Sequence, residues 1–244
     1  MSAHRSFLRI VFAWRRQITR YALAHQYGNR NGSAYIADPF SATAATSFES
    51  AFSFQLHNGG GVAGADGFTF IVTNSPAGNK TLSGGGHLLG AYDVPNSLVL
   101  GFRTYVYNEV VLTVDSMAAA NWYDVDNAIV TAPEPFDLNS GGIHYAWVEY
   151  DGLSNLFNLF LSSQDAKPSE AFLSAEVDLL EVLGGNQYYA GFTGAVGGAT
   201  NDHDILSFNF SSYEAPPLPE PTTLALMAAG LAGIGLSRRR KKTH

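Results

Sequence analysis

The sequence predicts an all-β domain built as a sandwich of two sheets, and three observations support this prediction. From Ser33 onward, short runs of alternating apolar and polar residues lie between clusters of Gly, Pro, Asn and Ser, which is the pattern of half-buried strands. No stretch of the body keeps a 3.6-residue period for three helical turns. Long glycine-rich loops flank the strands, which favours a sandwich with binding loops at one edge.

The expected elements follow one another along the chain. In the strand over residues 47–56, four large apolar side chains at even positions share one face. The run over residues 110–114 is almost wholly apolar, which predicts burial on both faces. Val177–Leu183 predicts a single helical turn, and Asp151-Gly152 predicts a hairpin turn. Further strands are expected over residues 67–72, 98–105, 144–150, 156–161, 188–192 and 205–210.

Composition and charge exclude several classes of function. The chain has 244 residues, of which 46% are hydrophobic, enough for one sizeable core. Only Lys80, Arg103 and Lys167 are basic between residues 31 and 237, whereas all 21 acidic residues lie there. Such a surface makes nucleic acid a poor partner, because phosphate contacts need clustered cations. Cysteine is absent, so no disulfide or thiolate metal site can form.

The C-terminal 31 residues form a distinct segment. Pro219, Glu220 and Pro221 interrupt regular structure, an uncharged apolar run follows, and five cations occupy residues 238–242. The run is shorter than the roughly 20 residues that cross a bilayer, and its basic end favours the cytoplasmic side. We therefore expect a short transmembrane helix over residues 222–237 within a tail that spans 214–244.

This tail resembles the PEP-CTERM sorting signal of Gram-negative bacteria. The resemblance implies that an exosortase membrane peptidase recognises Pro219-Glu220-Pro221. It also implies an exported protein that is held transiently in the inner membrane and then reaches the cell surface or the extracellular matrix.

Residues 1–27 form a basic segment that fits this destination poorly. The apolar run near the start is interrupted by Arg9 and followed by Arg15 and Arg16, so it is too short and too charged for a signal peptide. One interpretation is an amphipathic helix that lies on a membrane. The favoured interpretation is a misassigned start, with the true signal and the first strand missing. We expect residues 1–27 to pack poorly on a domain that spans 28–213.

Within that domain, several segments resemble an L-type (legume-type) lectin, in the family's order, over roughly residues 31–212. They are the Ala-Asp-Gly segment at 65–67, the glycine loop at 84–90, the hairpin at 146–152, and the closing segments at 177–179, 189–195 and 203–208. The resemblance implies a concanavalin-like jelly-roll β-sandwich with a flat sheet, a curved sheet and a shallow sugar site formed by loops on the curved side.

The resemblance also implies which residues bind the sugar. Asp66 would accept hydrogen bonds from two sugar hydroxyls, and Asn108 would supply an amide. Gly86 or its neighbour Gly85 would offer a backbone N–H where a side chain would block approach. Tyr105 would stack on the C–H face of the sugar.

Three further expectations concern the surroundings of that site. Tyr107 is an alternative to its neighbour for stacking, and the loop over residues 194–203 would shape specificity. The Ala65-Asp66 peptide bond is expected to be cis, as in the family. His203 is expected to order this loop rather than to bind a metal.

The sequence departs from the family at its calcium and manganese site. Family members carry Val-Glu-Phe-Asp-Thr on the strand that leads into that site, whereas residues 100–104 read Leu-Gly-Phe-Arg-Thr. Gly101 and Arg103 therefore replace two oxygen ligands, and calcium needs six to eight oxygens. We expect no cofactor, with Ca²⁺ as the alternative that the family implies. Arg103 is expected to supply the missing positive charge by pairing with Asp66 or Glu109.

An enzyme is the alternative class of function. Glu176, Asp178 and Glu181 resemble the Glu-x-Asp-x-x-Glu signature of laminarinase-like glycoside hydrolases, in which a strand places three carboxylates on one face. The glycines after Glu181 instead favour a helical turn that closes into a loop. We therefore expect a non-catalytic protein that binds a glycan or polysaccharide and has exosortase as its second partner. A structural matrix protein with the lectin fold and no working sugar site remains the other alternative.

Overall fold

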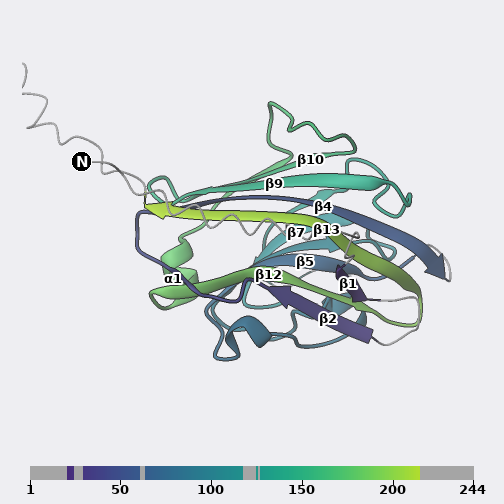
Figure 1. Ribbon diagram of the computed structural model, residues 1–244, viewed down its shortest axis with the longest axis horizontal. Helices are drawn as coiled ribbons and strands as arrows, with labels where there is room; N and C mark the ends of the chain where they lie inside the picture. Colours follow the sequence, from purple (N-terminus) through teal and green to yellow (C-terminus); the bar gives the residue numbers. More distant parts are fainter. Residues whose placement is uncertain (1–20, 25–29, 61–63, 118–124, 126, 215–244) are drawn as a thin grey trace, which may run out of the picture.

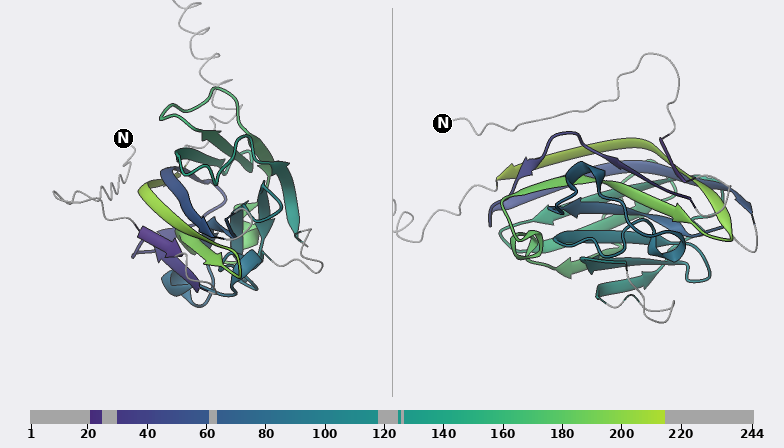
Figure 2. Two further views of the ribbon diagram at one scale, coloured as in Figure 1. Left: turned by 90° about the vertical axis from the view of Figure 1, so that its right-hand side faces the viewer. Right: turned by 90° about the horizontal axis from the view of Figure 1, so that it is seen from below.

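The computed structural model describes residues 21–24, 30–60, 64–117, 125 and 127–214. These residues form a sandwich of two antiparallel sheets, which face each other across the core (Figure 1, and end-on in Figure 2). The predicted all-β jelly roll is confirmed. One sheet has six strands in the order β1-β13-β4-β9-β10-β11, and the other has seven, with the order β2-β12-β5-β6-β7-β8 and β3 beside β12.

The strand bounds are as follows. The six-stranded sheet contains β1 (Tyr21–Ala24), β4 (Thr46–Gly60), β9 (Ile143–Asp151), β10 (Leu156–Ser162), β11 (Leu173–Glu176) and β13 (Thr200–Glu214). The seven-stranded sheet contains β2 (Arg30–Tyr35), β3 (Phe40–Ser41), β5 (Gly67–Thr73), β6 (Ser97–Arg103), β7 (Glu109–Val114), β8 (Ala128–Pro133) and β12 (Gln187–Val196). The short helical segments are η1 (Gly78–Lys80), η2 (Gly86–Leu88) and α1 (Leu179–Leu183).

The main core between the sheets is rich in phenylalanine. The even-numbered apolar residues of β4 are all at most 3% exposed, so the period-two prediction for this strand is confirmed. Phe68 of β5 stacks on Phe102 of β6 with ring centroids 4.6 Å apart, and Phe54 of β4 lies 4.8 Å from the Phe68 ring. Aromatic packing therefore joins the two sheets at the end where β5 begins and β6 ends.

A second apolar cluster covers the outer face of the seven-stranded sheet. Val111 of β7 belongs to it together with Leu89, Ala91 and Met117 from the loops that lie over this sheet. The neighbouring Val110 and Leu112 face the main core. The strand is thus buried on both faces, as its continuous apolar run predicted. The loops of the outer face consequently rest on an apolar layer.

Strand β13 runs the length of the six-stranded sheet. It pairs with β4 from Thr200 to Glu214 with two irregularities in register. At its last residue, the Glu214 carboxylate accepts hydrogen bonds from the hydroxyls of Thr43 and Thr46 at 2.6 and 2.9 Å. The end of the strand is therefore fixed to the connection that leads into β4.

The predicted helical turn is α1. Asp178 caps it, because its carboxylate accepts a hydrogen bond from the N–H of Glu181 at 3.0 Å, and Gly184 ends it with φ +57°. Glu176 is the last residue of β11. The three carboxylates thus lie on a strand end, a cap and a helix, not on one concave strand. The hydrolase arrangement is not present.

The N-terminal expectation needs a correction. Tyr21–Ala24 form β1, which pairs with β13, and the Leu23 and Ala24 side chains are each only 3% exposed. Apolar residues at these positions join the edge of the sheet and bury their side chains, so they do not pack poorly. The rest of the basic segment, and the tail from residue 215 onward with its expected helix over 222–237, lie outside the described residues. Glu214, the first residue of the expected tail, belongs instead to β13. Within the described part of the chain, no helix is long and apolar enough to span a bilayer.

Candidate functional site

The site is organised around the peptide bond between Ala65 and Asp66, just before β5. This bond is cis, as expected. The Asp66 N–H donates to the Ala195 carbonyl at 3.2 Å, and the Asp66 carbonyl accepts from the Thr104 N–H at 3.0 Å. The backbone at Asp66 is thus held between the end of β12 and the end of β6.

His203 fixes the other side of this bond. Its Nε2 lies 3.0 Å from the carbonyl oxygen of Ala65, and because a carbonyl only accepts, Nε2 carries the hydrogen. The imidazole is completely buried. Burial lowers the pKa of His203 to about 4, against the raising effects of the Ala65 carbonyl and of Asp202. The ring is therefore neutral, which agrees with an ordering role for His203 and not with a charged one.

The Asp66 carboxylate is buried with a free oxygen. Its Oδ2 has no hydrogen-bond partner among the described residues, and the residue is only 7% exposed. Burial raises the pKa of Asp66 to about 6, while a hydrogen bond from the backbone of Gly197 acts in the opposite direction. A desolvated carboxylate oxygen without a donor is costly to keep. It is the kind of group that a ligand hydroxyl would satisfy.

Two glycines flank this oxygen. A Cβ added to Gly197 would lie 3.1 Å from Asp66 Oδ2, and a Cβ added to Gly86 would lie 3.6 Å from the same atom. Gly86 also has φ +58°, in the left-handed region. A Cβ at Gly85 would meet nothing within 4 Å, so the backbone conformation favours glycine at 86 and not at 85. The sequence pointed to the loop over 194–203 but not to Gly197 itself.

The other two expected sugar contacts lie on the hairpin turn over residues 104–108, which connects β6 to β7. Asn108 is exposed, has φ +47°, and accepts a backbone hydrogen bond from Glu134 at 2.8 Å. Tyr105 is half-buried. The alternative ring, that of Tyr107, lies 3.9 Å from the guanidinium carbon of Arg103. One face of the Tyr107 ring is therefore covered by a cation.

Arg103 forms the expected ion pair. Its guanidinium contacts the Glu109 carboxylate, and the residue is only 1% exposed. The pKa of His87 on η2 is lowered mainly by burial and to a smaller extent by the positive charge of Arg103. Of the two partners expected from the sequence, Glu109 is the one that makes this pair.

The residues at the family's metal positions do not fit a calcium ion. Gly101 supplies no oxygen, and a Cβ at this position would meet Met117 Cε at 2.8 Å. Arg103 brings a positive charge instead of a carboxylate. Within the described residues, no three His, Cys, Asp or Glu side chains are grouped to hold a metal.

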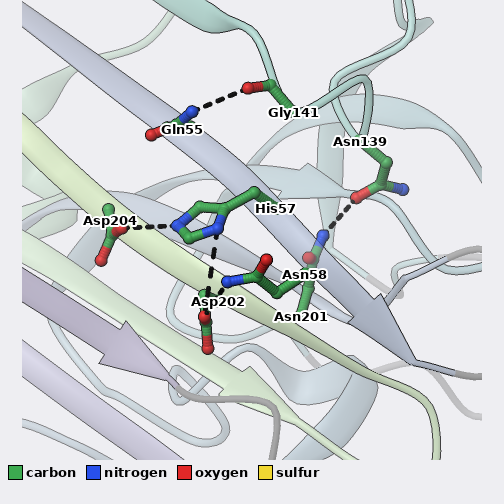
Figure 3. Close-up of polar contacts among 8 residues, drawn as sticks. All are labelled: Gln55, His57, Asn58, Asn139, Gly141, Asn201, Asp202 and Asp204. Atoms are coloured by element: carbon green, nitrogen blue, oxygen red, sulfur yellow. Dashed lines mark hydrogen bonds and ion pairs between the residues drawn. The ribbon is translucent and has the colours of Figure 1, made fainter.

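A polar network lies where β4 meets β13 (Figure 3). His57 of β4 contacts Asp204 at 2.7 Å and lies 4.0 Å from Asp202. Next to it, the Asn201 amide donates to Asn139 Oδ1 at 2.7 Å. The sequence showed no sign of this network, because its members come from strands and loops that are distant along the chain.

The Asn139 amide in turn donates to the Thr104 carbonyl at 3.3 Å. Hydrogen bonds thus connect the start of β13, through Asn201 and Asn139, to the hairpin turn over 104–108. The network supports the turn from the side of the six-stranded sheet.

A jelly roll of this topology, with a cis Ala-Asp peptide among its loops, is typical of legume-type lectin folds. The chain belongs to this family: the legume lectin domain matches residues 29–225. Residues 217–241 match the PEP-CTERM protein-sorting motif, which indicates export.

Relatives and solved structures agree with this assignment. A lectin-like protein of Arabidopsis thaliana is 30% identical over 198 residues, which cover 71% of each protein. An L-type lectin-domain containing receptor kinase of the same plant is 29% identical over 177 residues, 68% of this chain but only 24% of the kinase. The chain thus spans about a quarter of the length of such receptor kinases.

Two solved structures show the same fold. A lectin from Bauhinia forficata in complex with GalNAc superposes with a TM-score of 0.66 at 23% identity, covering 84% of this chain and 96% of the other. Arcelin-5, a lectin-like defence protein from Phaseolus vulgaris, superposes with a TM-score of 0.64 at 21% identity, covering 80% and 87%.

Proposed function

We propose that this protein is a non-catalytic lectin that binds a glycan through Asp66. The observation that carries the proposal is the buried Oδ2 of Asp66, which has no partner among the described residues and is flanked by Gly86 and Gly197. A donor from outside the protein would satisfy this oxygen. Sugar hydroxyls are such donors, and the absence of side chains at Gly86 and Gly197 leaves room for them beside this oxygen.

The proposed contacts follow from the surroundings of Asp66. Two hydroxyls of one sugar ring donate to the carboxylate in charge-assisted hydrogen bonds, which are stronger than neutral ones. The low-dielectric surroundings strengthen these bonds further. The Gly86 N–H and the Asn108 side chain contact other hydroxyls, and the Tyr105 ring covers the apolar face of the sugar. The loop that contains Gly197 selects among sugars.

The structural neighbours suggest which sugars to try first. One neighbour was solved with GalNAc, and another, a winged bean acidic lectin, with methyl-α-D-galactose. We propose a cell-surface or matrix polysaccharide as the natural ligand class, with GalNAc and galactose as the first probes.

The tail supports a proposal about location. The motif over residues 217–241 would be the substrate of an exosortase that acts at Pro219-Glu220-Pro221. Before cleavage, the apolar run over 222–237 would hold the protein in the inner membrane. After cleavage, the lectin domain would be released to the cell surface or the extracellular matrix.

A structural matrix role is the second candidate. The exchange of two family metal ligands for Gly101 and Arg103 favours it, because a site without its metal is one route to a lectin fold that binds no sugar. The two candidates differ in one measurable property, which is whether any glycan binds at Asp66.

The test is a glycan array probed with the full chain in mild detergent, beside the variants Asp66→Asn and Asp165→Asn. Asp165 is an exposed loop carboxylate and serves as the matched control. Binding that is lost in Asp66→Asn and kept in Asp165→Asn would support the lectin. Binding of no glycan by the folded wild-type protein would overturn it in favour of the structural role.

A further inference from the structure

The hairpin turn over residues 104–108 carries two of the proposed sugar contacts, and one residue pair closes it. Arg103 at the end of β6 is directly opposite Glu109 at the start of β7, and this is the last pair of the ladder before the turn. Their side chains form an ion pair. The position of Tyr105 and Asn108 therefore depends on how firmly this base of the turn is held.

Arg103 is buried, and burying a positive charge destabilises the fold unless a negative charge or hydrogen bonds compensate for the lost hydration. Its side chain is 2% exposed, whereas that of Glu109 is 20% exposed. A buried charge persists only when it is paired and hydrogen-bonded. Besides Glu109, the guanidinium faces the ring of Tyr107 at 3.9 Å, which adds a cation–π contact. Charge pair and ring together fix the guanidinium between the strand and the turn.

The same cation acts on the neighbouring glycine loop. The charge of Arg103 lowers the pKa of His87, which directly follows Gly86 on η2. On its other side, the turn is joined to Asp66 through the hydrogen bond from the Thr104 N–H to the Asp66 carbonyl. Arg103 pairs with Gly67, next to Asp66, on one side and with Glu109, next to Asn108, on the other. It thus lies between the backbone segments that carry Asp66 and Asn108.

The family resemblance implies a resident metal that positions the corresponding segments, and two of its ligand positions are occupied here by Gly101 and Arg103. We propose that Arg103 is a positioning residue that replaces this metal. Paired with Glu109, it holds the turn over 104–108 beside Asp66, so that glycan binding requires no divalent cation. The binding part of this proposal rests on the proposed function, whereas the positioning part can be measured without a glycan.

The guanidinium is suited to this role in a way that an ammonium is not. It presents its N–H groups in a planar fork and stacks on an aromatic face while it pairs with a carboxylate. Arg103→Lys keeps the charge but loses the fork and the stacking. Glu109→Gln keeps the volume but removes the negative charge that the Arg103 guanidinium contacts. Both variants should loosen the turn and leave the core intact.

The experiment uses the full chain in mild detergent. Hydrogen exchange compares residues 104–108 with the centre of β4 in wild type, Arg103→Lys, Arg103→Met and Glu109→Gln. The control is Lys167→Met, which removes the surface pair with Glu149. We expect exchange in the turn to rise about tenfold, equivalent to about 1.4 kcal/mol, in all three site variants, with β4 unchanged. The control should not alter the turn.

Divalent cations form the second arm. Calcium chloride titrated into wild type that was treated with EDTA should give no binding heat and no shift in Tm. GalNAc, or another glycan that the array identifies, should bind equally with EDTA and with calcium, and at least tenfold more weakly to Glu109→Gln.

The outcomes separate the two proposals. Calcium binding that raises Tm, or unchanged exchange of the turn in Glu109→Gln, would overturn the role of Arg103. If Arg103→Met does not fold, Glu109→Gln and Arg103→Lys still test whether the ion pair positions the turn. If no glycan binds the wild type while the turn responds as expected, Arg103 is confirmed as the positioning residue and only the lectin function fails.

Discussion

The Nε2 of His203 donates a hydrogen bond to the carbonyl of Ala65, at 3.0 Å, inside a region that excludes water completely around the imidazole. His203 belongs to β13 in one sheet, and Ala65 immediately precedes the carboxylate that we assign to glycan binding. A buried residue of the six-stranded sheet therefore holds the backbone next to Asp66.

Removal of this imidazole should destabilise the protein. His203→Ala leaves the buried Ala65 carbonyl without its donor and opens a cavity, so we expect a loss of about 2–4 kcal/mol in the free energy of unfolding. His203→Gln, which retains an N–H donor, should lose less. Denaturant titration of both variants measures this, and equal losses would contradict the importance of the hydrogen bond.

Glycan binding should weaken at acidic pH. The folded-state pKa of Asp66 is raised to about 6, and a protonated carboxyl accepts fewer hydrogen bonds than a carboxylate. Affinity should therefore be full above pH 7 and should fall as the pH decreases through about 6. Calorimetric titrations from pH 5 to 8 measure the profile, and a flat affinity between pH 7 and 5 would show that Asp66 does not contact the glycan.

The same carboxylate should cost stability at neutral pH. Its folded pKa lies above its ordinary value of 3.8, so the folded state binds more protons than the unfolded state between about pH 4 and 6, and stability falls as the pH rises through that window. Asp66→Asn removes this charge. We expect the variant to have a higher Tm than wild type at pH 7 and to lose glycan binding, and a lower Tm would contradict the burial argument.

Substitution by alanine should weaken glycan binding at Gly197 but not at the neighbouring Gly198. In Gly197→Ala, the new Cβ would lie 3.1 Å from Asp66 Oδ2 and 3.5 Å from the Gly86 Cα, which narrows the space above the carboxylate. We expect at least tenfold weaker glycan binding with little change in Tm. Gly198→Ala is the matched control, because a Cβ there meets nothing within 4 Å, and its affinity should equal that of wild type.

The carboxylates of the hydrolase-like motif should matter for stability alone. Asp178→Ala removes the cap of α1, which we expect to cost about 1 kcal/mol. Glu176→Gln and Glu181→Gln should be nearly neutral, because both side chains are exposed. All three variants should bind glycan as wild type does. Weaker binding in any of them would mean that this end of the sandwich contributes to recognition.

The sequence predicted the parts of the fold that depend on local patterns. The period-two face of β4 and the doubly buried β7 were both evident, because side-chain alternation is a property of the strand itself. The membership of Tyr21–Ala24 in the sheet was missed, since this pairing joins residues about 180 positions apart and the surrounding segment is dominated by arginine.

The site shows the same division. The cis bond was expected from the family resemblance at Ala65 and Asp66. An ion pair of Arg103 was expected with either Asp66 or Glu109, and the structure shows the pair with Glu109. The position of Gly197 beside Asp66 and the contact between His203 and Ala65 were not predicted. The sequence around a glycine in a glycine-rich loop does not indicate which residues of other segments pack against it. Such contacts depend on how two loops from different strands come together.

Strand β13 determines how the domain would be presented to its surroundings. It begins at Thr200, three residues after Gly197 and beside the loops that we propose bind a glycan. It ends at Glu214 after fifteen residues, a span of about 45 Å at the rise of an extended strand. The chain therefore continues toward the sorting motif from the end of the sandwich opposite Asp66. If the domain were attached to a surface at this end, the loops near Asp66 would face away from that surface and toward the surroundings.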